Sequence, residues 1–244
     1  EAIERLGLPS DVLPEIASSA LPLAGLCGSV AETLGIPGNP VVCSPIGDAQ
    51  ASIVGAAGFS RDTIVLNLGT GGQVSIPRPD HAVTEELDAW PMPLGGFAQV
   101  GATLCGGWSY AYLRRFFQDV ARESCGGALS DEEAYERINE LAASAPPGAD
   151  GLRADTRFSG TRRDKGVRGS ITGISTTNLM PGNLALAVIE GVVNDLHSMW
   201  LSSDRRDARR LIASGNGVRK NPVLRAAIRR AFDVECLMSS MPEE

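Results

Sequence analysis

Asp48 is a carboxylate whose position suits it to act as a general base. It follows a short apolar stretch, residues 40–43, and opens a segment of helical character, residues 48–57. A carboxylate at the carboxyl end of a buried strand points into the crevice where α/β proteins bind ligands, and there it can accept a proton from a hydroxyl. The alternative is an ordinary helix N-cap, which Asp48 taken alone favours.

A threonine–glycine turn could bind phosphate. Residues 69–72 read Gly-Thr-Gly-Gly and lie between two stretches of strand character, residues 63–68 and 73–76. Such a turn exposes backbone N–H groups to anions, and its glycines let a phosphate approach closely. A hairpin turn without a ligand is an equal alternative. The turn is not a P-loop, because no Gly-Lys-Ser/Thr follows it.

Two further glycine-containing segments precede predicted helices. Gly106 and Gly107 lead into a helix predicted at residues 108–123, where they could border a ring or a phosphate, although close helix–strand packing explains them equally well. Residues 213–217 read Ala-Ser-Gly-Asn-Gly and precede a helix that Asn221 would cap. A strand, a Gly-x-Gly turn and a helix in succession are a weak nucleotide-binding signal by themselves.

The elements that must position these residues mix strands and helices throughout, so the sequence predicts an α/β fold. Capping boxes are expected at Ser29 with Glu32 and at Ser130 with Glu133. A loop is expected at residues 78–95, and residues 40–43 should form a buried strand. The remaining expected elements are strands at 97–104, 211–213 and 235–238 and helices at 10–20, 29–34, 130–143, 184–200 and 222–232.

Composition argues against several functions. The net charge is −7 and basic runs are short, so we expect no nucleic-acid partner. The five cysteines are scattered without C-x-x-C spacing, which favours a reducing compartment, and two histidines are too few for a His-rich metal site. Because no apolar run approaches the ~18 residues of a membrane span and no signal peptide is visible, we expect no membrane association and a cytoplasmic location.

The chain has features of a piece of a longer protein. Its first residue is Glu1, and Ser240 with Glu243 forms a capping box that announces a helix just before the sequence stops. We therefore expect further sequence on both sides.

In combination and order, the segments resemble the second half of the FGGY carbohydrate kinases over essentially the whole chain. The hairpin and the segment EGVVNDLHSM are most similar to sedoheptulokinase-like members. Thr161 and Ala185 depart from the family, which commonly has glutamate and arginine there, and Ala111 stands where some relatives have a polar residue. The segments that carry the resemblance are IGDAQASIVGA, LNLGTGGQVS, RFSGTRRDKGVRGSITGIS, LALAVIEGVVNDL and IASGNGVRKNPVLRAAIRRAF.

The resemblance implies an actin-like ATPase (ribonuclease H-like) fold of two domains separated by a cleft. Residues 1–58 would be the tail of the first, sugar-binding domain, and residues 59–244 most of the second, nucleotide-binding domain without its final helix. The implied activity is ATP-dependent phosphorylation of a sugar hydroxyl, with a ketose such as sedoheptulose as the first expectation. Alternatives are a xylulose, gluconate or glycerol kinase, a non-catalytic nucleotide-binding fragment, or another actin-like ATPase that activates water.

The resemblance also implies roles for the residues singled out above. Asp48 would be the catalytic base, contact the sugar and help to hold Mg²⁺, facing the turn near Thr70 across the cleft. The isolated chain should lack kinase activity, since half an active site cannot close on a sugar. For the oligomeric state, a homodimer is an alternative to a monomer. The residues expected to bind ATP are Gly69, Thr70, Gly71, Gly106, Gly107, Gly215, Asn216 and Asn221.

Overall fold

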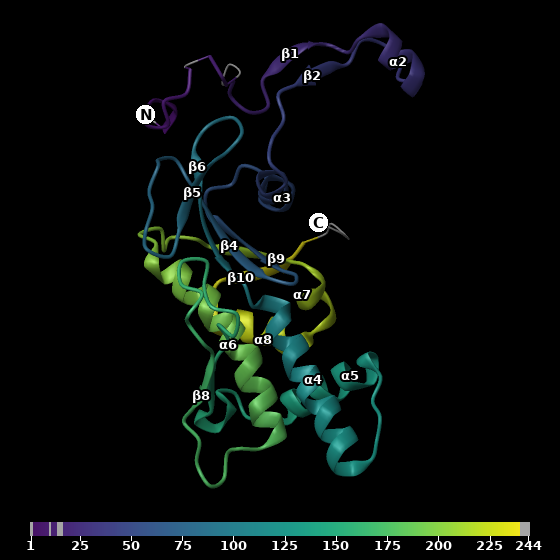
Figure 1. The fold of residues 1–244 in the computed structure, drawn as a ribbon, viewed down its shortest axis with the longest axis vertical. Helices are drawn as coiled ribbons and strands as arrows, with labels where there is room; N and C mark the ends of the chain where they lie inside the picture. The colour runs from purple at the N-terminus through teal and green to yellow at the C-terminus, as the bar shows by residue number, and fades with distance from the viewer. Residues whose placement is uncertain (1, 10, 14–16, 240–244) are drawn as a thin grey trace. The chain divides into compact units, whose positions relative to one another are not determined.

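The computed structural model describes residues 2–9, 11–13 and 17–239 of the 244-residue chain. It divides into two compact units, Glu1–Ala51 with Met92–Gly95 and Ser52–Pro91 with Gly96–Glu244. The boundary between residues 51 and 52 falls inside helix α3 (Asp48–Ala57), which is labelled in Figure 1. The capping box expected at residues 240–243 lies outside the described residues.

The smaller unit contains few contacts and mostly exposed residues. Its strands β1 and β2 pair antiparallel, and the strand expected to be buried, β2, is exposed along its whole length. A sheet of only two short strands is too small to bury its residues by itself. The elements that begin in this unit are α1 (Ala2–Arg5), β1 (Pro22–Gly25), α2 (Gly28–Leu34), β2 (Val41–Cys43) and α3 (Asp48–Ala57).

Two further predictions in the smaller unit are wrong. The helix expected at residues 10–20 is absent from residues 11–13 and 17–20, and the rest of that stretch lies outside the described residues. Helix α2 begins before Ser29, with Cys27 as its N-cap and no side-chain capping bond, so the Ser29–Glu32 box does not form. The hydroxyl of Thr33 instead donates to the Ser29 carbonyl inside the helix.

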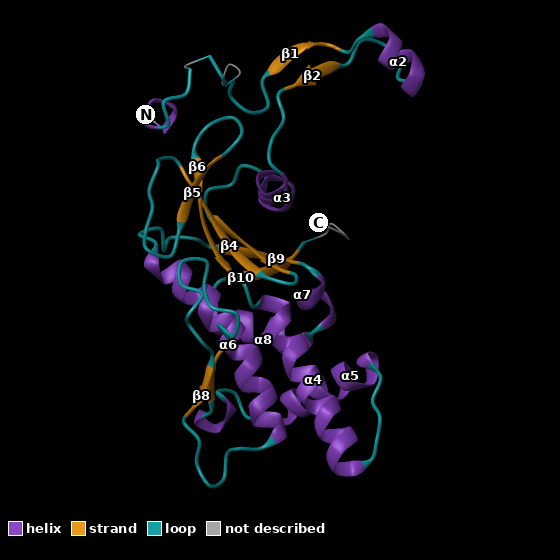
Figure 2. Ribbon diagram, in the orientation of Figure 1, coloured by secondary structure: helices purple, strands orange, loops and turns teal. Residues whose placement is uncertain are grey.

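The larger unit is built on a six-stranded mixed sheet with the order β10-β9-β3-β4-β6-β5 (Figure 2). Strand β9 runs parallel to both β3 and β10, whereas β4, β6 and β5 continue from β3 as antiparallel neighbours. The strands are β3 (Thr63–Leu68), β4 (Gly72–Arg78), β5 (Asp88–Pro91), β6 (Phe97–Thr103), β9 (Arg210–Ser214) and β10 (Glu235–Met238).

Helix α6 (Pro181–Ser202) is the centre of the core. Its apolar residues recur every three or four positions, so one broad face is buried against β4 and β6 and other sides contact α4, α5 and α8. By length and composition α6 could cross a membrane, but most of that stretch is buried inside the fold, as in the core helix of a soluble protein. The other helices are α4 (Gly106–Cys125), α5 (Asp131–Ser144), α7 (Asn216–Lys220) and α8 (Pro222–Phe232), with a 3-10 turn, η1 (Ala149–Gly151).

Several local predictions for the larger unit are confirmed. The capping box at Ser130 and Glu133 forms at the start of α5, and Asn221 caps α8.

The loop expected at residues 78–95 instead contains β5, an edge strand whose prolines obscured it in the sequence. The structure also adds a short antiparallel pair, β7 (Arg153–Asp155) with β8 (Ser170–Thr172).

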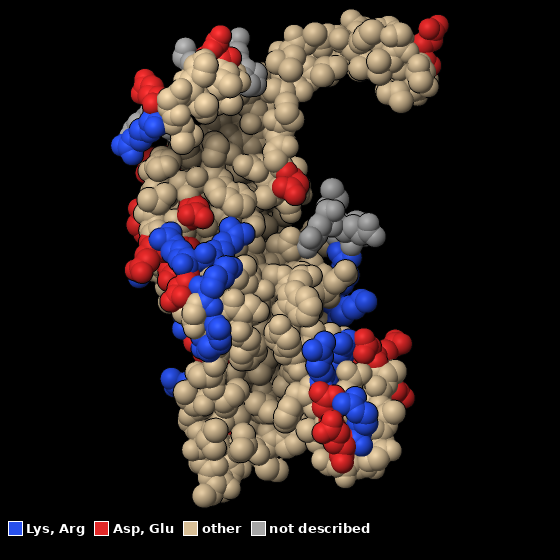
Figure 3. All heavy atoms as spheres, in the orientation of Figure 1, with Lys and Arg blue, Asp and Glu red and all other residues tan. Residues whose placement is uncertain are grey.

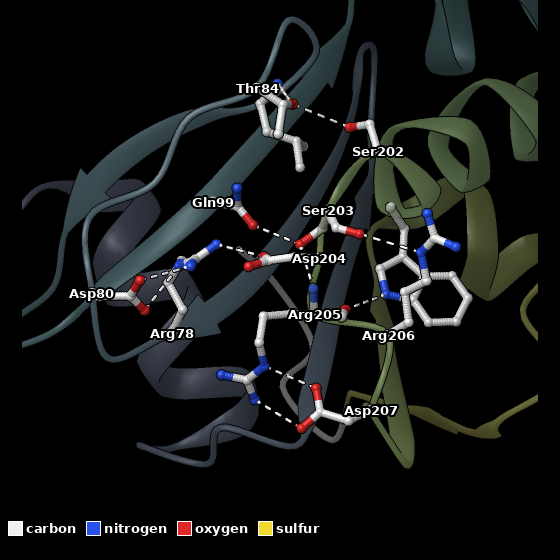
Figure 4. A network of polar contacts seen from close by, with 12 residues as sticks. Arg78, Asp80, Thr84, Gln99, Ser202, Ser203, Asp204, Arg205, Arg206 and Asp207 are labelled. Carbon is white, nitrogen blue, oxygen red and sulfur yellow. Dashed lines mark hydrogen bonds and ion pairs between the residues drawn. The ribbon is translucent and has the colours of Figure 1, made fainter.

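A polar network fastens the end of α6 to the sheet (Figure 4). Arg78, at the end of β4, is 4% exposed, and its guanidinium lies 2.9 Å from carboxylate oxygens of both Asp80 and Asp204. The hydroxyl of Ser203 donates to the buried Gln99 side chain of β6 at 2.6 Å. Because Gln99 and Arg78 belong to neighbouring strands, the network holds the α6 terminus in place over both.

Candidate active site

The turn between β3 and β4 is held by the first residues of helix α4. The backbone N–H of Gly107 donates to the carbonyl of Gly69 at 2.9 Å, and the N–H of Trp108 donates to the carbonyl of Thr70 at 3.0 Å. The first N–H groups of a helix have no partner within the helix, so they are available for such bonds. The predicted phosphate-binding turn and the predicted glycine pair are therefore one structural unit.

Glycine is required at this junction by close backbone packing. A Cβ on Gly106 would lie 2.3 Å from the carbonyl oxygen of Gly71, and one on Gly107 would lie 2.5 Å from that of Gly69. A Cβ on Gly71 would lie 2.9 Å from the carbonyl oxygen of Thr103. The helix–strand packing alternative thus accounts for the glycines at 106 and 107, whether or not they also border a nucleotide.

The third glycine segment meets the same strand end. Strand β9 runs parallel to β3 with Ser214 beside Asn67, which brings the turn after β9 to the carboxyl end of β3. Gly215 has φ +94, and a Cβ on it would lie 2.5 Å from the carbonyl oxygen of Leu68. Asn216 follows as an exposed residue at the start of α7, a short helix that the sequence did not predict.

Asn221 caps helix α8 near this end of the sheet. Its side-chain oxygen accepts the N–H of Leu224 at 3.0 Å. The Tyr110 hydroxyl lies 2.5 Å from Asn139 of α5, and burial raises the pKa of Tyr110, so the phenol stays neutral. No local motif in the sequence signals this polar role of Tyr110.

The exposed side of the junction is formed by the turn itself. Thr70 is exposed, and Gly69 and Gly71 on either side of it are half-buried. Parallel strands in open α/β sheets bind ligands at their carboxyl ends, which is where β3 and β9 present these turns. The space-filling view shows acidic and basic side chains next to one another on the visible face, without a surface of a single sign (Figure 3).

Asp48 belongs to the smaller unit, whereas the turn belongs to the larger one. It is the first residue of α3, is exposed, and its Oδ1 accepts the N–H of Ala49 at 2.7 Å. The described ranges contain no group of three His, Cys, Asp or Glu residues able to hold a metal ion. One exposed carboxylate nevertheless suits Mg²⁺, which commonly binds through substrate phosphates, water and one or two carboxylates.

No family model matches the chain. It is 27% identical over 249 residues to a sedoheptulokinase of Mus musculus, covering 95% of this chain and 49% of that protein. It is 27% identical over 194 residues to a xylulose kinase of Staphylococcus epidermidis, covering 77% of this chain and 36% of that protein. The chain therefore spans about half the length, or less, of these curated relatives.

Solved structures share the fold. The xylulose kinase from Rhodospirillum rubrum superposes with a TM-score of 0.83 at 22% identity, covering 98% of this chain and 47% of that one. The Plasmodium falciparum glycerol kinase with ADP gives a TM-score of 0.75 at 18% identity, covering 96% and 45%. These likenesses confirm the predicted α/β class and the actin-like ATPase fold.

Proposed function

We propose that this chain, which belongs to the FGGY carbohydrate kinases and corresponds to their carboxy-terminal portion, supplies the general base and most of the ATP site of a sugar kinase. The observation that carries the proposal is the convergence of three glycine segments on the carboxyl end of β3. Convergence of turns from distant parts of the chain at one strand end is typical of a ligand site in an α/β sheet.

The turn after β3 is proposed to bind the phosphates of ATP. Gly69, Thr70 and Gly71 expose backbone and hydroxyl donors on the outer side of the junction, while the inner side is fixed to α4. A fixed donor set stabilises the charge of a transferring phosphoryl group without reorganising during the reaction. Gly106 and Gly107 then border the nucleotide, and Gly215, Asn216 and Asn221 lie toward adenine and ribose.

Asp48 is the proposed general base. It would accept the proton of the sugar hydroxyl as that oxygen attacks the γ-phosphorus, which requires a carboxylate within hydrogen-bond reach of the substrate. Magnesium, when bound, neutralises phosphate charge, and Asp48 is the residue of this chain proposed to help hold it. The two domain assignments, residues 1–58 and 59–244, belong to the same proposal.

The proposed acceptor is a ketose such as sedoheptulose, supported by the similarity to the mouse sedoheptulokinase along 95% of the chain. Xylulose, gluconate and glycerol are the alternatives within the family. The proposal needs a small-molecule sugar and ATP in the cytoplasm, and it requires no nucleic acid, membrane or second subunit.

The test is a panel of ketoses and polyols with ATP, applied to the intact protein that contains these residues. Phosphorylation of sedoheptulose above the other sugars supports the proposal. ATP hydrolysis that no sugar stimulates would favour an actin-like ATPase that activates water. Residues 1–244 alone are expected to phosphorylate no sugar. If the intact protein binds ADP but transfers no phosphoryl group, the non-catalytic alternative is favoured.

A further inference from the structure

Helix α4 begins without a side-chain cap. Its N-cap residue is Cys105, whose backbone is not extended and whose thiol makes no capping bond. An N-cap side chain normally accepts the N–H of the second or third helical residue. In α4 these residues are Gly107 and Trp108, and their N–H groups donate to the carbonyls of Gly69 and Thr70 instead. The position of the β3–β4 turn therefore depends on where the first turn of α4 is held.

The segment 156–159, which follows β7, contacts the same first turn of α4. The N–H of Ser159 donates to Cys105 Sγ at 3.2 Å, and the Ser109 hydroxyl donates to the Thr156 carbonyl at 3.2 Å. The Ser109 hydroxyl also contacts the Cys105 carbonyl, so its one hydrogen is shared between two acceptors. Cys105 and Ser109 are both fully buried, so water does not compete for these contacts.

The segment 156–159 is itself fixed to the rest of the larger unit. A Cβ on Gly191 of α6 would lie 2.9 Å from the methyl group of Thr156, and a Cβ on Gly169 would overlap the ring of Phe158. The Phe158 ring also meets the ring of Tyr112 of α4 edge to face, with the two centroids 6.2 Å apart. The segment is therefore a firm anchor against which the start of α4 can be held.

Local preferences of a helix start do not account for Cys105 and Ser109. Serine, threonine, aspartate and asparagine are the preferred N-cap residues, and a thiol is not among them. Alanine favours a helix more than serine does, so Ser109 lowers the intrinsic stability of α4. The contacts of both side chains with residues 156–159 explain what the helix gains from them.

We propose that Cys105 and Ser109 are positioning residues for the proposed phosphate-binding turn. They hold the first turn of α4 against residues 156–159, and α4 in turn holds Gly69 and Thr70. The inference rests on the proposed function, because it assumes that this turn binds ATP. Both side chains are fully buried and act through α4, so their effect is on nucleotide affinity rather than on the binding of the sugar.

Matched variants separate the hydrogen bonds from simple filling of space. Cys105→Ser keeps an acceptor for the Ser159 N–H, whereas Cys105→Ala removes it with a side chain of nearly the same size. Ser109→Ala removes the donor to Thr156. The control is Ser203→Ala, because Ser203 is also buried and donates one hydrogen bond, to Gln99, which lies further along β6 from the turn.

The experiment uses the intact protein and measures ADP affinity by calorimetry and KM for ATP and for the sugar. Cys105→Ala and Ser109→Ala are each expected to weaken ADP binding and raise KM for ATP about fivefold, the usual net contribution of one hydrogen bond. Their KM for the sugar should not change. Cys105→Ser and Ser203→Ala should stay within about twofold of the wild type in all three quantities. Either alanine variant of α4 suffices if the other does not fold.

The outcomes separate this role from the proposed function. The positioning role alone is overturned if the wild type binds ADP and both alanine variants of α4 bind it equally well. It is also overturned if both KM values rise together or if Ser203→Ala weakens ADP binding as much. A wild type that binds ADP but phosphorylates no sugar refutes the kinase proposal, and the ADP affinities then test the positioning role by themselves. A wild type that binds no nucleotide overturns both.

Discussion

Gly106 and Gly71 meet backbone against backbone, so closely that a Cβ on Gly106 would lie 2.3 Å from the carbonyl oxygen of Gly71. These residues come from the start of a helix and from a hairpin turn that are far apart in sequence. The contact leaves no room for adjustment, because the opposing atom is backbone rather than the end of a flexible side chain. A side chain added at Gly106 should therefore displace the turn.

Gly106→Ala should weaken nucleotide binding at least tenfold, because either the turn or α4 must move to accept the methyl group. ADP affinity of the intact protein, measured by calorimetry, checks this. Gly127→Ala, just beyond the other end of α4, has its nearest contact at 3.8 Å and should bind ADP like the wild type. Equal affinity in the two variants would contradict the proposed place of the nucleotide.

Asp48→Ala should lower kcat by about 10²–10⁴, the usual contribution of a general base, while ADP affinity changes little. Steady-state kinetics of the intact enzyme with its best sugar provide the measurement. Glu132→Ala removes another exposed carboxylate from a first helical turn and should leave kcat unchanged. Wild-type turnover in Asp48→Ala would refute the catalytic assignment.

Asn221→Ala should destabilise the larger unit by about 1 kcal/mol or somewhat more, since it removes the cap that accepts the Leu224 N–H. Denaturant unfolding, followed by circular dichroism, measures the difference. Asn221→Asp keeps an oxygen at the capping position and should recover most of the loss. If Asn221→Asp is as unstable as Asn221→Ala, the cap is not the source of the effect.

Asp62→Asn should destabilise the protein at neutral pH and have less effect in acid. Hydrogen bonds from Ser60, Arg210 and Thr63 lower the pKa of Asp62 from 3.8 to about 2. A lowered folded-state pKa means that the ionised group stabilises the fold above the ordinary pKa, and that this contribution is lost as the pH falls toward 2.

The measurement for Asp62 is the difference in unfolding free energy between wild type and Asp62→Asn at several pH values. The difference should be constant above about pH 5 and shrink between about pH 4 and pH 2. Because the Asp62 carboxylate is exposed, added salt should reduce it as well. A difference that is independent of pH would rule out the ionised carboxylate as the cause.

Patterns local in sequence predicted much of the larger unit. Strands β3 and β10 and helix α8 have the predicted bounds. A run of apolar, partly β-branched residues marks β3, and the pair Asn221–Pro222 marks the start of α8. The Ser29–Glu32 box failed although its residue types were right, because α2 starts two residues too early for Ser29 to cap it. A capping motif fixes a helix start only when the backbone at that residue is not already helical.

The contacts that hold the candidate site together were not predictable in the same way. The sequence marked Gly71, Gly106 and Gly215 as unusual. A hairpin turn without a ligand explained Gly71, and close packing explained Gly106, as well as ligand binding did, whereas the segment at Gly215 was only a weak nucleotide-binding signal. The packing of Thr103 against Gly71 and Gly72 carries no motif and joins residues that become neighbours only through the pairing of β4 with β6. The expectation that Asp48 faces Thr70 stays a prediction.

The hydrogen bonds from Gly107 and Trp108 to the carbonyls of Gly69 and Thr70 have an electrostatic consequence. Each carbonyl that accepts a bond polarises its own peptide group, and hydrogen bonds in series strengthen one another. The positive end of the α4 macrodipole is thereby transmitted through two peptide planes into the hairpin. The amides of the turn become better anion donors than those of an isolated glycine bend, without any added lysine or arginine.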